Sequence, residues 1–360
     1  MRREIPLILG AGPAGCAAAI ALARSGTKPV IIEKTRETGD ALCGGFLSWQ
    51  SLRQLESLGV ERLEGHSITQ VRVMSGKHTV TAQLPAPAVG VSRHHLDTAM
   101  QSVALSAGAA LERGVTVRRH ADGVLHTDGQ NFTPDALFLA VGKHEIRGLA
   151  RPKPDGDAPL GLRVRIASHP KLRQMLQHTI ELHLFAGGYA GLLLQEDGSA
   201  NLCMALRKSR LAVAGGNPAM LLQELGLAHP LLGERLAFLT EGTPTEAIGA
   251  VPYGWRAIET VPGIFRLGDQ AAVIPSLAGE GMGIAIASGK LAATTFLSGG
   301  GAAAPAFQRE FAARTRRPVA VAGFLWRQAE RPKLVRLALP ILNAFPALAG
   351  LAARMTRIGD

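Results

Sequence analysis

The chain has 360 residues, of which 47% are hydrophobic, and is long enough for one large or two intertwined domains with a substantial core. Its three cysteines, Cys16, Cys43 and Cys203, cannot build a disulfide framework, so we expect a reducing, cytoplasmic compartment. The net charge is +11, but aromatic residues make up only 4% and no nucleic-acid motif occurs, which argues against nucleic acid as a partner.

The N-terminal segment has the pattern of a dinucleotide-binding unit. Its predicted elements are a strand over 5–9, a glycine turn over 10–15, a small-residue helix over 16–25 and a strand over 29–32. Gly10 permits the tight turn, Gly12 lets the backbone approach a pyrophosphate, and Gly15 lets helix and strand pack closely. Glu33 follows Gly15 by 18 residues, the spacing of a carboxylate that binds a ribose hydroxyl.

The next hundred residues alternate between helical and strand patterns. Leu52, Leu55 and Leu58 recur at helical spacing before Gly59. The later predicted elements are strands within 66–84 ended by Pro85-Ala86-Pro87, a helix from Arg93 to Gly108, a strand at 115–117, a hairpin turning at Asp128-Gly129, and a buried strand over 136–141.

The middle of the chain alternates in the β manner. Strands are predicted over 160–166, 180–185 and 191–206, the last with a turn at Asp197-Gly198, followed by a helix over 218–236. A strand over 264–267 ends at Gly268-Asp269, and a small-residue helix over 281–297 follows. The stretch 299–305 has the composition of a linker or flexible turn, and the last 60 residues have a helical pattern.

These elements predict an α/β protein with discontinuous domains. A Rossmann-like, three-layer domain with a mainly parallel sheet takes residues 1–65, 91–159 and 255–300, and an inserted antiparallel-sheet substrate domain takes 66–90 and 160–254. Residues 301–360 form a C-terminal helical segment.

Only one glycine fingerprint occurs, so its site holds either the redox cofactor itself or a nicotinamide that binds and leaves. The segment from Gly268-Asp269 to Gly283 helps to decide between them. An Asp at a strand end can hydrogen-bond a ribityl hydroxyl, and glycines that open a helix bring N–H groups to a pyrophosphate or a flavin edge.

The chain as a whole resembles flavoproteins of the p-hydroxybenzoate-hydroxylase fold group. Within that group it most resembles the geranylgeranyl-reductase-like branch. The motifs that carry the resemblance are the 10–15 fingerprint with Glu33, Cys43-Gly44-Gly45, Arg93 with Leu96-Asp97, Ala140-Val141-Gly142, Gly188-Tyr189-Ala190-Gly191, and the block from Gly268 to Gly283. The resemblance implies an extended FAD with its adenosine at the fingerprint and its isoalloxazine ring between the domains. It also implies that Glu33 binds the ribose, that Arg93 lies near the pyrophosphate or ribityl chain, and that Asp269 binds the ribityl chain.

The cofactor-binding residues that these arguments predict are Gly10, Gly12, Pro13, Ala14, Gly15, Glu33, Lys34, Cys43, Gly44, Gly45, Arg93, Gly142, Gly268, Asp269, Gly279, Gly281, Met282 and Gly283. Two of them have plainer alternatives, since Arg93 could simply begin a surface helix and Asp269 could simply form a turn.

Three side chains are candidates for catalysis. Cys43, followed in its loop by Gly44-Gly45, could tune the flavin or deliver a proton, or could be a packed small residue. Tyr189 and Tyr253 are the only tyrosines, and either phenol could donate a proton to a substrate or orient a ring, or could be an interdomain aromatic. No histidine pair has the context of metal ligands, so we predict no metal.

The reaction implied by the resemblance is reduction of C=C bonds in an apolar or lipid-like substrate by hydride transfer from reduced flavin, with an external electron donor, either NAD(P)H or a redox protein. The alternatives are a flavin monooxygenase acting on an aromatic or polyketide-like substrate, and a non-catalytic flavin-binding partner protein. Hydroxylases of this fold usually carry Asp-Gly where this chain has Val141-Gly142, and the reductase branch usually carries Tyr-x-Trp-x-Phe-Pro where this chain keeps only Tyr189.

The C-terminal segment is basic and then apolar. Residues 301–360 carry ten Arg or Lys against three acidic residues, and 337–353 is uncharged but interrupted by Pro340 and Pro346. We expect either a peripheral contact with an anionic membrane surface, such as the inner membrane, or a lid for an apolar substrate. The alternative is a helix pair packed on the rest of the protein.

Overall fold

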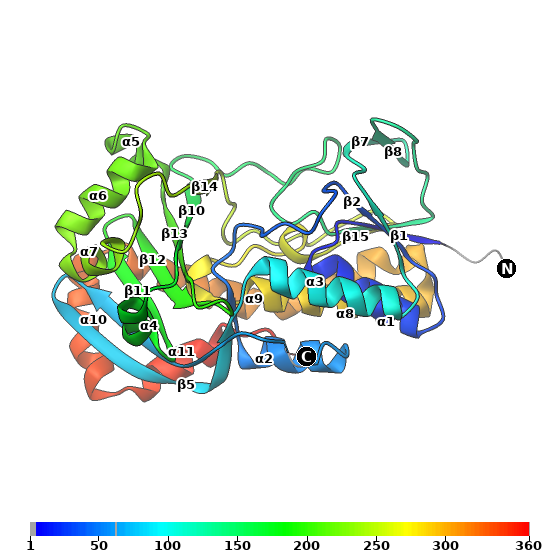
Figure 1. Ribbon diagram of the computed structural model, residues 1–360. Coiled ribbons are helices and arrows are strands. Elements are labelled where there is room, and N and C mark those ends of the chain that lie inside the picture. Colours follow the sequence, from blue (N-terminus) through cyan, green and yellow to red (C-terminus); the bar gives the residue numbers. More distant parts are fainter. Residues whose placement is uncertain (1–4, 62, 360) are drawn as a thin grey trace.

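The computed structural model describes residues 5–61 and 63–359, which form two sheets with helices packed along them (Figure 1). The fold is α/β, as predicted: a parallel sheet of five strands, a curled mixed sheet of eight, and a helical C-terminus. The fingerprint residues and both tyrosines lie in the part of the molecule where the two sheets approach each other.

The first sheet is the parallel sheet of the Rossmann-like domain. Its strand order is β15-β9-β1-β2-β6, in which β1 has parallel neighbours on both sides. The strands are β1 (Pro6–Leu9), β2 (Val30–Glu33), β6 (Ala110–Arg113), β9 (Ala136–Leu139) and β15 (Ile264–Arg266). The predicted strand at 115–117 is wrong in position, because the edge pairing with β2 is made by residues 110–113 instead.

Helices cover one face of this sheet and a hairpin covers the other, which gives three layers. The helices are α1 (Pro13–Arg24), α3 (Arg93–Ser106) and α8 (Gly281–Gly299). Small residues let α1 and α8 touch: a Cβ on Gly289 would lie 2.4 Å from the Ala14 carbonyl oxygen. Beneath α8, Phe138 and Phe265 stack with ring centroids 4.7 Å apart.

The hairpin on the other face consists of β7 (Val117–Ala121) and β8 (Val124–Thr127). It turns at Asp122-Gly123, where both residues have positive φ. Positive φ at both central residues is the geometry of the two-residue hairpin turn, for which Asp-Gly is a favoured pair. The chain also turns at Asp128-Gly129, as predicted, after which Phe132 bridges back antiparallel to Leu125.

The second sheet, in the order β14-β10-β13-β12-β11-β4-β5-β3, forms the inserted domain. Its strands are β3 (Phe46–Leu47), β4 (His66–Ser75), β5 (His78–Gly90), β10 (Pro159–Ile166), β11 (Thr179–Phe185), β12 (Gly188–Leu194), β13 (Ala200–Arg207) and β14 (Thr245–Ile248). The sheet is mixed rather than wholly antiparallel, because β11 pairs parallel to β4. That pair joins the two sequence segments, 66–90 and 160–254, that were assigned to this domain.

Strand β5 continues through the prolines that were expected to end it. Pairing with β4 passes from Gln70–Gln83 directly to Ile68–Ala88, so Leu84 to Pro87 form an irregularity in the ladder. Proline has no N–H to donate, and a bulge is where a strand tolerates it.

Short helices flank the sheets. They are α2 (Trp49–Ser57), α4 (Pro170–Leu176), α5 (Lys208–Val213), α6 (Pro218–Ala228) and α7 (Pro230–Leu236). The single helix predicted over 218–236 is divided into α6 and α7 because Pro230 follows the non-helical His229.

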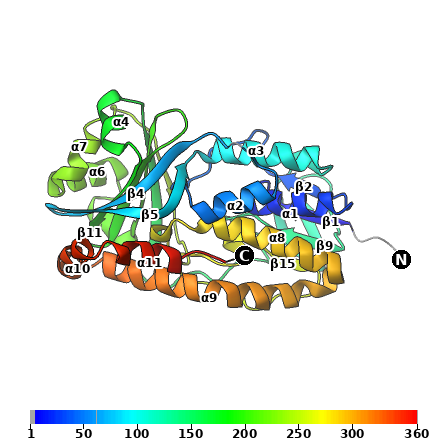
Figure 2. The ribbon, with the colours of Figure 1, turned by 90° about the horizontal axis from the view of Figure 1, so that it is seen from below.

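The C-terminal helices bind the two sheets together. Helix α9 (Ala304–Ala329) runs along α8, and α10 (Pro332–Ala344) and α11 (Ala347–Met355) pack on β5 (Figure 2). Of the two alternatives predicted for 299–305, the structure has the turn and not the linker, because residues 301–303 form a short 3₁₀ turn that leads straight into α9. No single helix of the described residues is both long and apolar enough to cross a membrane. Helices α10 and α11 pass that test only together, and the chain bends by 112° between them.

Candidate active site

A cavity of about 630 Å³ lies where the carboxyl ends of the parallel strands face the second sheet. Gly10, Lys34 and Ala140 line it directly after β1, β2 and β9, and Gly268 lines it after β15. In open α/β sheets, ligands bind outside the carboxyl ends of the strands. The cavity therefore lies where the Rossmann architecture places a dinucleotide.

The fingerprint turn is shaped by the absence of side chains. Gly10 has φ +111°, and a Cβ there would lie 2.5 Å from the Ala140 carbonyl oxygen. A Cβ on Gly15 would lie 1.9 Å from the Gly10 carbonyl oxygen, so Gly15 serves packing and faces away from the cavity. Helix α1 begins at Pro13 with Gly12 as its N-cap, which has no side chain to occupy the helix N–H groups. The positive end of α1 is left open toward the cavity for an anion.

Glu33 organises the loops at this end. Its carboxylate accepts hydrogen bonds from the Ala11 N–H at 2.9 Å and from the Thr35 N–H and hydroxyl at 3.0 Å. The neighbouring Lys34 ammonium lies 2.9 Å from Nε2 of His144. All four lie in the cavity wall with Glu33, so the carboxylate predicted to bind a ribose also fixes the fingerprint turn.

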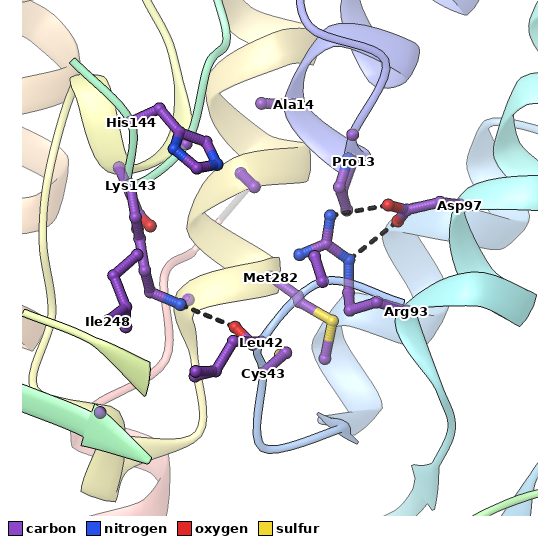
Figure 3. Close-up of a pocket in the computed structure, with 18 of the residues that line it drawn as sticks. Pro13, Ala14, Leu42, Cys43, Arg93, Asp97, Lys143, His144, Ile248 and Met282 are labelled. Carbon is purple, nitrogen blue, oxygen red and sulfur yellow. Dashed lines mark hydrogen bonds and ion pairs between the residues drawn. The ribbon is translucent and has the colours of Figure 1, made fainter. Parts of the chain in front are cut away.

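Arg93 forms a two-pronged ion pair with Asp97, one turn further along α3 (Figure 3). Its Nε and Nη2 donate to the two carboxylate oxygens at 2.9 and 2.8 Å. Burial opposes the charged form, but the adjacent Asp97 carboxylate outweighs it and raises the pKa of Arg93. A Cβ on Gly12 would lie 3.1 Å from Arg93 Nη2. A permanent positive charge therefore stands beside the fingerprint, where a pyrophosphate would bind.

Two acidic side chains from outside α3 hold the start of this helix. Glu196 accepts from the Ser92 N–H at 2.8 Å and from its hydroxyl at 2.5 Å. Asp40 accepts from the Arg93 N–H at 3.0 Å and pairs with Arg163 at 2.9 Å. Glu196 lies between β12 and β13, and Arg163 lies on β10, so these contacts join the two domains next to the cavity.

The loop that carries Cys43 is braced through its carbonyl oxygens. Arg163 donates to the Asp40 and Ala41 carbonyls at 2.7 and 3.0 Å. Lys143 donates to the Leu42 carbonyl at 3.0 Å (Figure 3). Asn201 donates to the Cys43 carbonyl at 3.0 Å. Four successive peptide groups are thus fixed by side chains, and Cys43 and Gly44 are held in the cavity wall.

The loops after β9 and β15 are joined to each other. Gln270 donates to the Gly142 and His144 carbonyls at 2.9 and 2.8 Å, and the Gly268 N–H donates to the Ser288 hydroxyl at 2.8 Å. The main chain of Asp269 accepts from Arg151 at 2.8 Å, while the residue itself lines the cavity. Asp269 therefore lies in the cavity wall, at the carboxyl end of the parallel sheet.

Gly279, Gly281 and Met282 line the cavity at the start of α8. Gly279 has φ +62° and packs closely on Phe46, since a Cβ would lie 2.8 Å from its ring. Gly283 faces the other way, toward Glu280 and Ser51.

Both tyrosines line the cavity and pack against Trp326 of helix α9. The rings of Tyr189 and Tyr253 meet Trp326 edge-on, with centroids 5.8 and 5.7 Å apart. The Tyr253 hydroxyl lies 2.6 Å from the Ser276 hydroxyl. Burial raises the pKa of both phenols, so both are protonated at neutral pH.

All the predicted site residues line this one cavity except Gly15 and Gly283, which are not among its lining residues in the described chain. Sequence reasoning missed the residues that position the wall, namely Asp40, Lys143, Arg163, Glu196, Asn201 and Trp326. Lys143 could have been suspected because it follows Gly142 at the end of a buried strand. The others come from separate elements and have no local signal. Among the other cysteines, Cys16 is fully buried and Cys203 lines the cavity.

The cavity fits an extended dinucleotide cofactor. Gly44, Gly142 and Gly281 line it, and a Cβ on any of them would meet no protein atom within 4 Å, so each borders open space. The open end of α1 and the adjacent Arg93 suit a pyrophosphate, and the carboxylates of Glu33 and Asp269 suit hydroxyl groups on either side. The fold and the cavity together define a dinucleotide-binding α/β protein whose cofactor site opens onto a second sheet.

Comparison with known proteins agrees with this geometry. Residues 5–148 match the family described as FAD binding domain. Menaquinone reductase of Mycolicibacterium smegmatis is 27% identical over 324 residues, which cover 82% of this chain and 76% of the relative. Digeranylgeranylglycerophospholipid reductase 2 of Methanopyrus kandleri is 24% identical over 314 residues, covering 79% and 75%.

Among solved structures, PqsL of Pseudomonas aeruginosa, described as a probable FAD-dependent monooxygenase, has the same fold. The TM-score is 0.73 at 18% identity, over 92% of this chain and 98% of that one. This chain is an FAD-dependent oxidoreductase that has the fold of the p-hydroxybenzoate-hydroxylase group, and it is similar in sequence to the two reductases reported above.

Proposed function

We propose that the protein reduces a C=C bond of an apolar, polyprenyl-type substrate. The observation that carries the proposal is the lining of the cavity where it enters the second sheet. Apolar side chains from several strands and loops gather there, namely Ile180, Leu182, Leu193, Met204, Ile248, Val251 and Leu277. A wall of this kind binds a hydrocarbon chain by removing it from water and offers little to a highly charged substrate.

FAD, when bound and reduced, supplies the hydride equivalent, and the protein must supply the proton. Tyr253 is the side chain best placed to do so, because it lines the cavity and its hydroxyl has a hydrogen-bonding neighbour in Ser276. Burial keeps the phenol protonated, so it can donate to the second carbon of the reduced bond. Tyr189 and Cys43 are the alternative donors.

The sequence relatives support the same substrate class. The two reductases reported above are named for menaquinone and for a digeranylgeranyl glycerophospholipid, and both molecules carry polyprenyl chains. The electrons come from an external donor, NAD(P)H or a redox protein. We carry over only the class of substrate, because identities of 24–27% do not define which lipid is bound.

The second candidate is a monooxygenase acting on an aromatic or polyketide-like substrate, which the fold shared with PqsL favours. The open cavity reaching both tyrosines supports an enzyme over a non-catalytic flavin-binding partner. Product analysis separates the two enzymes. The protein, reduced by dithionite without oxygen, should add two hydrogen atoms to a geranylgeranyl lipid, detected by mass spectrometry. Product that forms only with oxygen and contains an added oxygen atom would establish the monooxygenase instead.

A further inference from the structure

Helix α10 is apolar on two opposite faces. On one face Val335 and Leu339 are buried in a cluster with Tyr189 and Trp326. On the other, Leu337 and Ile341 are 69% and 54% exposed, and Leu334 lies one turn before them. A surface helix normally has one apolar stripe, which it buries, and polar residues on the remaining faces. The outer face of α10 is therefore a second apolar stripe that no described part of the chain buries.

The exposed apolar surface continues around the bend into α11. Phe345, between the two helices, is 63% exposed, and Leu348 and Leu351 of α11 are also exposed. We name the set Leu334, Leu337, Ile341, Phe345, Leu348 and Leu351 the apolar elbow. Figures 1 and 2 show α10 and α11 on the outside of the second sheet, at the end of the molecule away from the N-terminus.

Positive charge surrounds the apolar elbow. Lys333, Arg336 and Arg354 are exposed on the same two helices, and Arg331 is exposed at the N-cap of α10. Between Arg331 and Gly359 the sequence contains no Asp or Glu. Exposed apolar side chains among unopposed cations are the composition of a segment that lies in the interface of an anionic bilayer.

The charge also argues against a second copy of this chain as the cover. A two-fold dimer places the same patch on both partners, so the cations of one elbow would face those of the other with no acidic residue of either helix between them. We propose that the apolar elbow docks the protein on the surface of an anionic lipid bilayer. The inner face of α10 belongs to the same buried cluster as Tyr189, so docking would bring the wall of the cavity close to the source of an apolar substrate.

Vesicle binding tests this proposal on the intact flavoprotein, without any substrate. The wild type should float with vesicles of phosphatidylglycerol and phosphatidylcholine, bind pure phosphatidylcholine weakly, and be released by salt. The variant L337Q/I341Q/F345Q should bind the anionic vesicles at least about tenfold less well. The variant K333E/R336E should lose at least about 25-fold, because each basic side chain near such a surface contributes about fivefold and the new carboxylates are repelled by the anionic lipid.

Matched controls use exposed residues elsewhere. V213Q/L227Q/V261Q removes three exposed apolar side chains, and K28E/K153E makes the same change in charge, and both should bind as the wild type does. Equal binding by the elbow variants and their controls would overturn the proposal. So would sedimentation showing a wild-type dimer that L337Q/I341Q/F345Q dissociates, because the cover would then be a second copy. Activity toward a detergent-dispersed lipid, measured separately, distinguishes failure of docking from failure of the proposed reaction.

Discussion

The guanidinium of Arg357, after the last helix, pairs with the buried carboxylate of Glu280 directly before α8. Arg357 also donates to the Gly279 carbonyl at 3.2 Å and to the Ala278 carbonyl at 2.8 Å. The same group lies over the Trp49 ring, 5.2 Å from its centroid. The C-terminal segment thus fixes the loop from which Gly279 and Gly281 reach the cavity.

Removing this contact should weaken both the fold and cofactor binding. Arg357→Gln leaves the Glu280 carboxylate buried without its partner, which costs about 3–5 kcal/mol of unfolding free energy. Denaturant unfolding of the flavin-free protein and titration with FAD measure the two effects. The double variant E280Q/R357Q should recover part of the stability, because no uncompensated charge remains. Additive losses in the two single variants would show that the residues act independently.

A methyl group placed in the cavity should separate cofactor binding from stability. In Gly281→Ala the new Cβ meets no protein atom within 4 Å and projects from a residue of the cavity wall. Alanine is also the better helix former, so the thermal midpoint of the flavin-free protein should hold or rise. The dissociation constant for FAD should increase. Gly129→Ala, at an exposed glycine outside the cavity, is the matched control. Unchanged FAD affinity in Gly281→Ala would remove this residue from the cofactor site.

Tyr253→Phe should lower the rate of substrate reduction without loss of bound FAD. A positioned proton donor contributes about 10²–10⁴-fold to such a step. Burial raises the pKa of Tyr253, so the wild-type rate should not fall through ionisation of this phenol between pH 7 and 9. Stopped-flow traces recorded at several pH values measure the rate of the variant and the pH dependence of the wild-type rate. Ser276→Ala should reduce the rate less, because the donor itself remains. A Tyr253→Phe rate equal to that of the wild type would assign the proton to Tyr189 or Cys43.

A buried carboxylate in the second sheet should make the fold sensitive to acid. Burial favours the neutral form of Glu181, but hydrogen bonds from His183 and Arg235 outweigh it and hold the pKa at about 2, below its ordinary value of 4.5. A carboxylate with a depressed pKa stabilises the fold above pH 4.5 and loses that contribution as the pH falls toward 2, on the order of 3 kcal/mol in all.

Glu181→Gln tests this assignment. The variant should be less stable than the wild type at pH 7, because Arg235 and Arg72 lose their charged partner. Between pH 5 and 3 its unfolding free energy should fall less steeply than that of the wild type. Parallel curves for the two proteins would place the acid sensitivity elsewhere.

The sequence predicts the cofactor end of the site more fully than the reacting end. Gly10, Gly12 and Glu33 belong to one pattern within about thirty residues of sequence. The turn and the close approach of a pyrophosphate require the glycines, and the ribose requires the carboxylate, so the pattern can be recognised locally. The hydrogen bonds that hold the Cys43 loop cannot be predicted from a local sequence pattern. Their donors, Lys143, Arg163 and Asn201, come from separate elements that meet only in the folded protein.

The element boundaries that differ from expectation have local causes. A bulge opposite Thr69 lets β5 pass through Pro85 and Pro87, and positive φ at Asp122 and Gly123 sets the turn between β7 and β8. The position of Trp326 behind both tyrosines depends on how α9 packs over the whole length of the protein, and no periodicity in α9 indicates that contact.

The most direct test of the account follows reoxidation of the photoreduced enzyme in a stopped-flow spectrometer. Mixed with a polyprenyl lipid in the absence of oxygen, the flavin should regain its oxidised absorbance in one phase, and the lipid should gain two hydrogen atoms. Reoxidation by air alone should be slow. No anaerobic reoxidation by the lipid, with fast reaction with oxygen and an oxygenated product from an aromatic substrate, would contradict the reductase assignment.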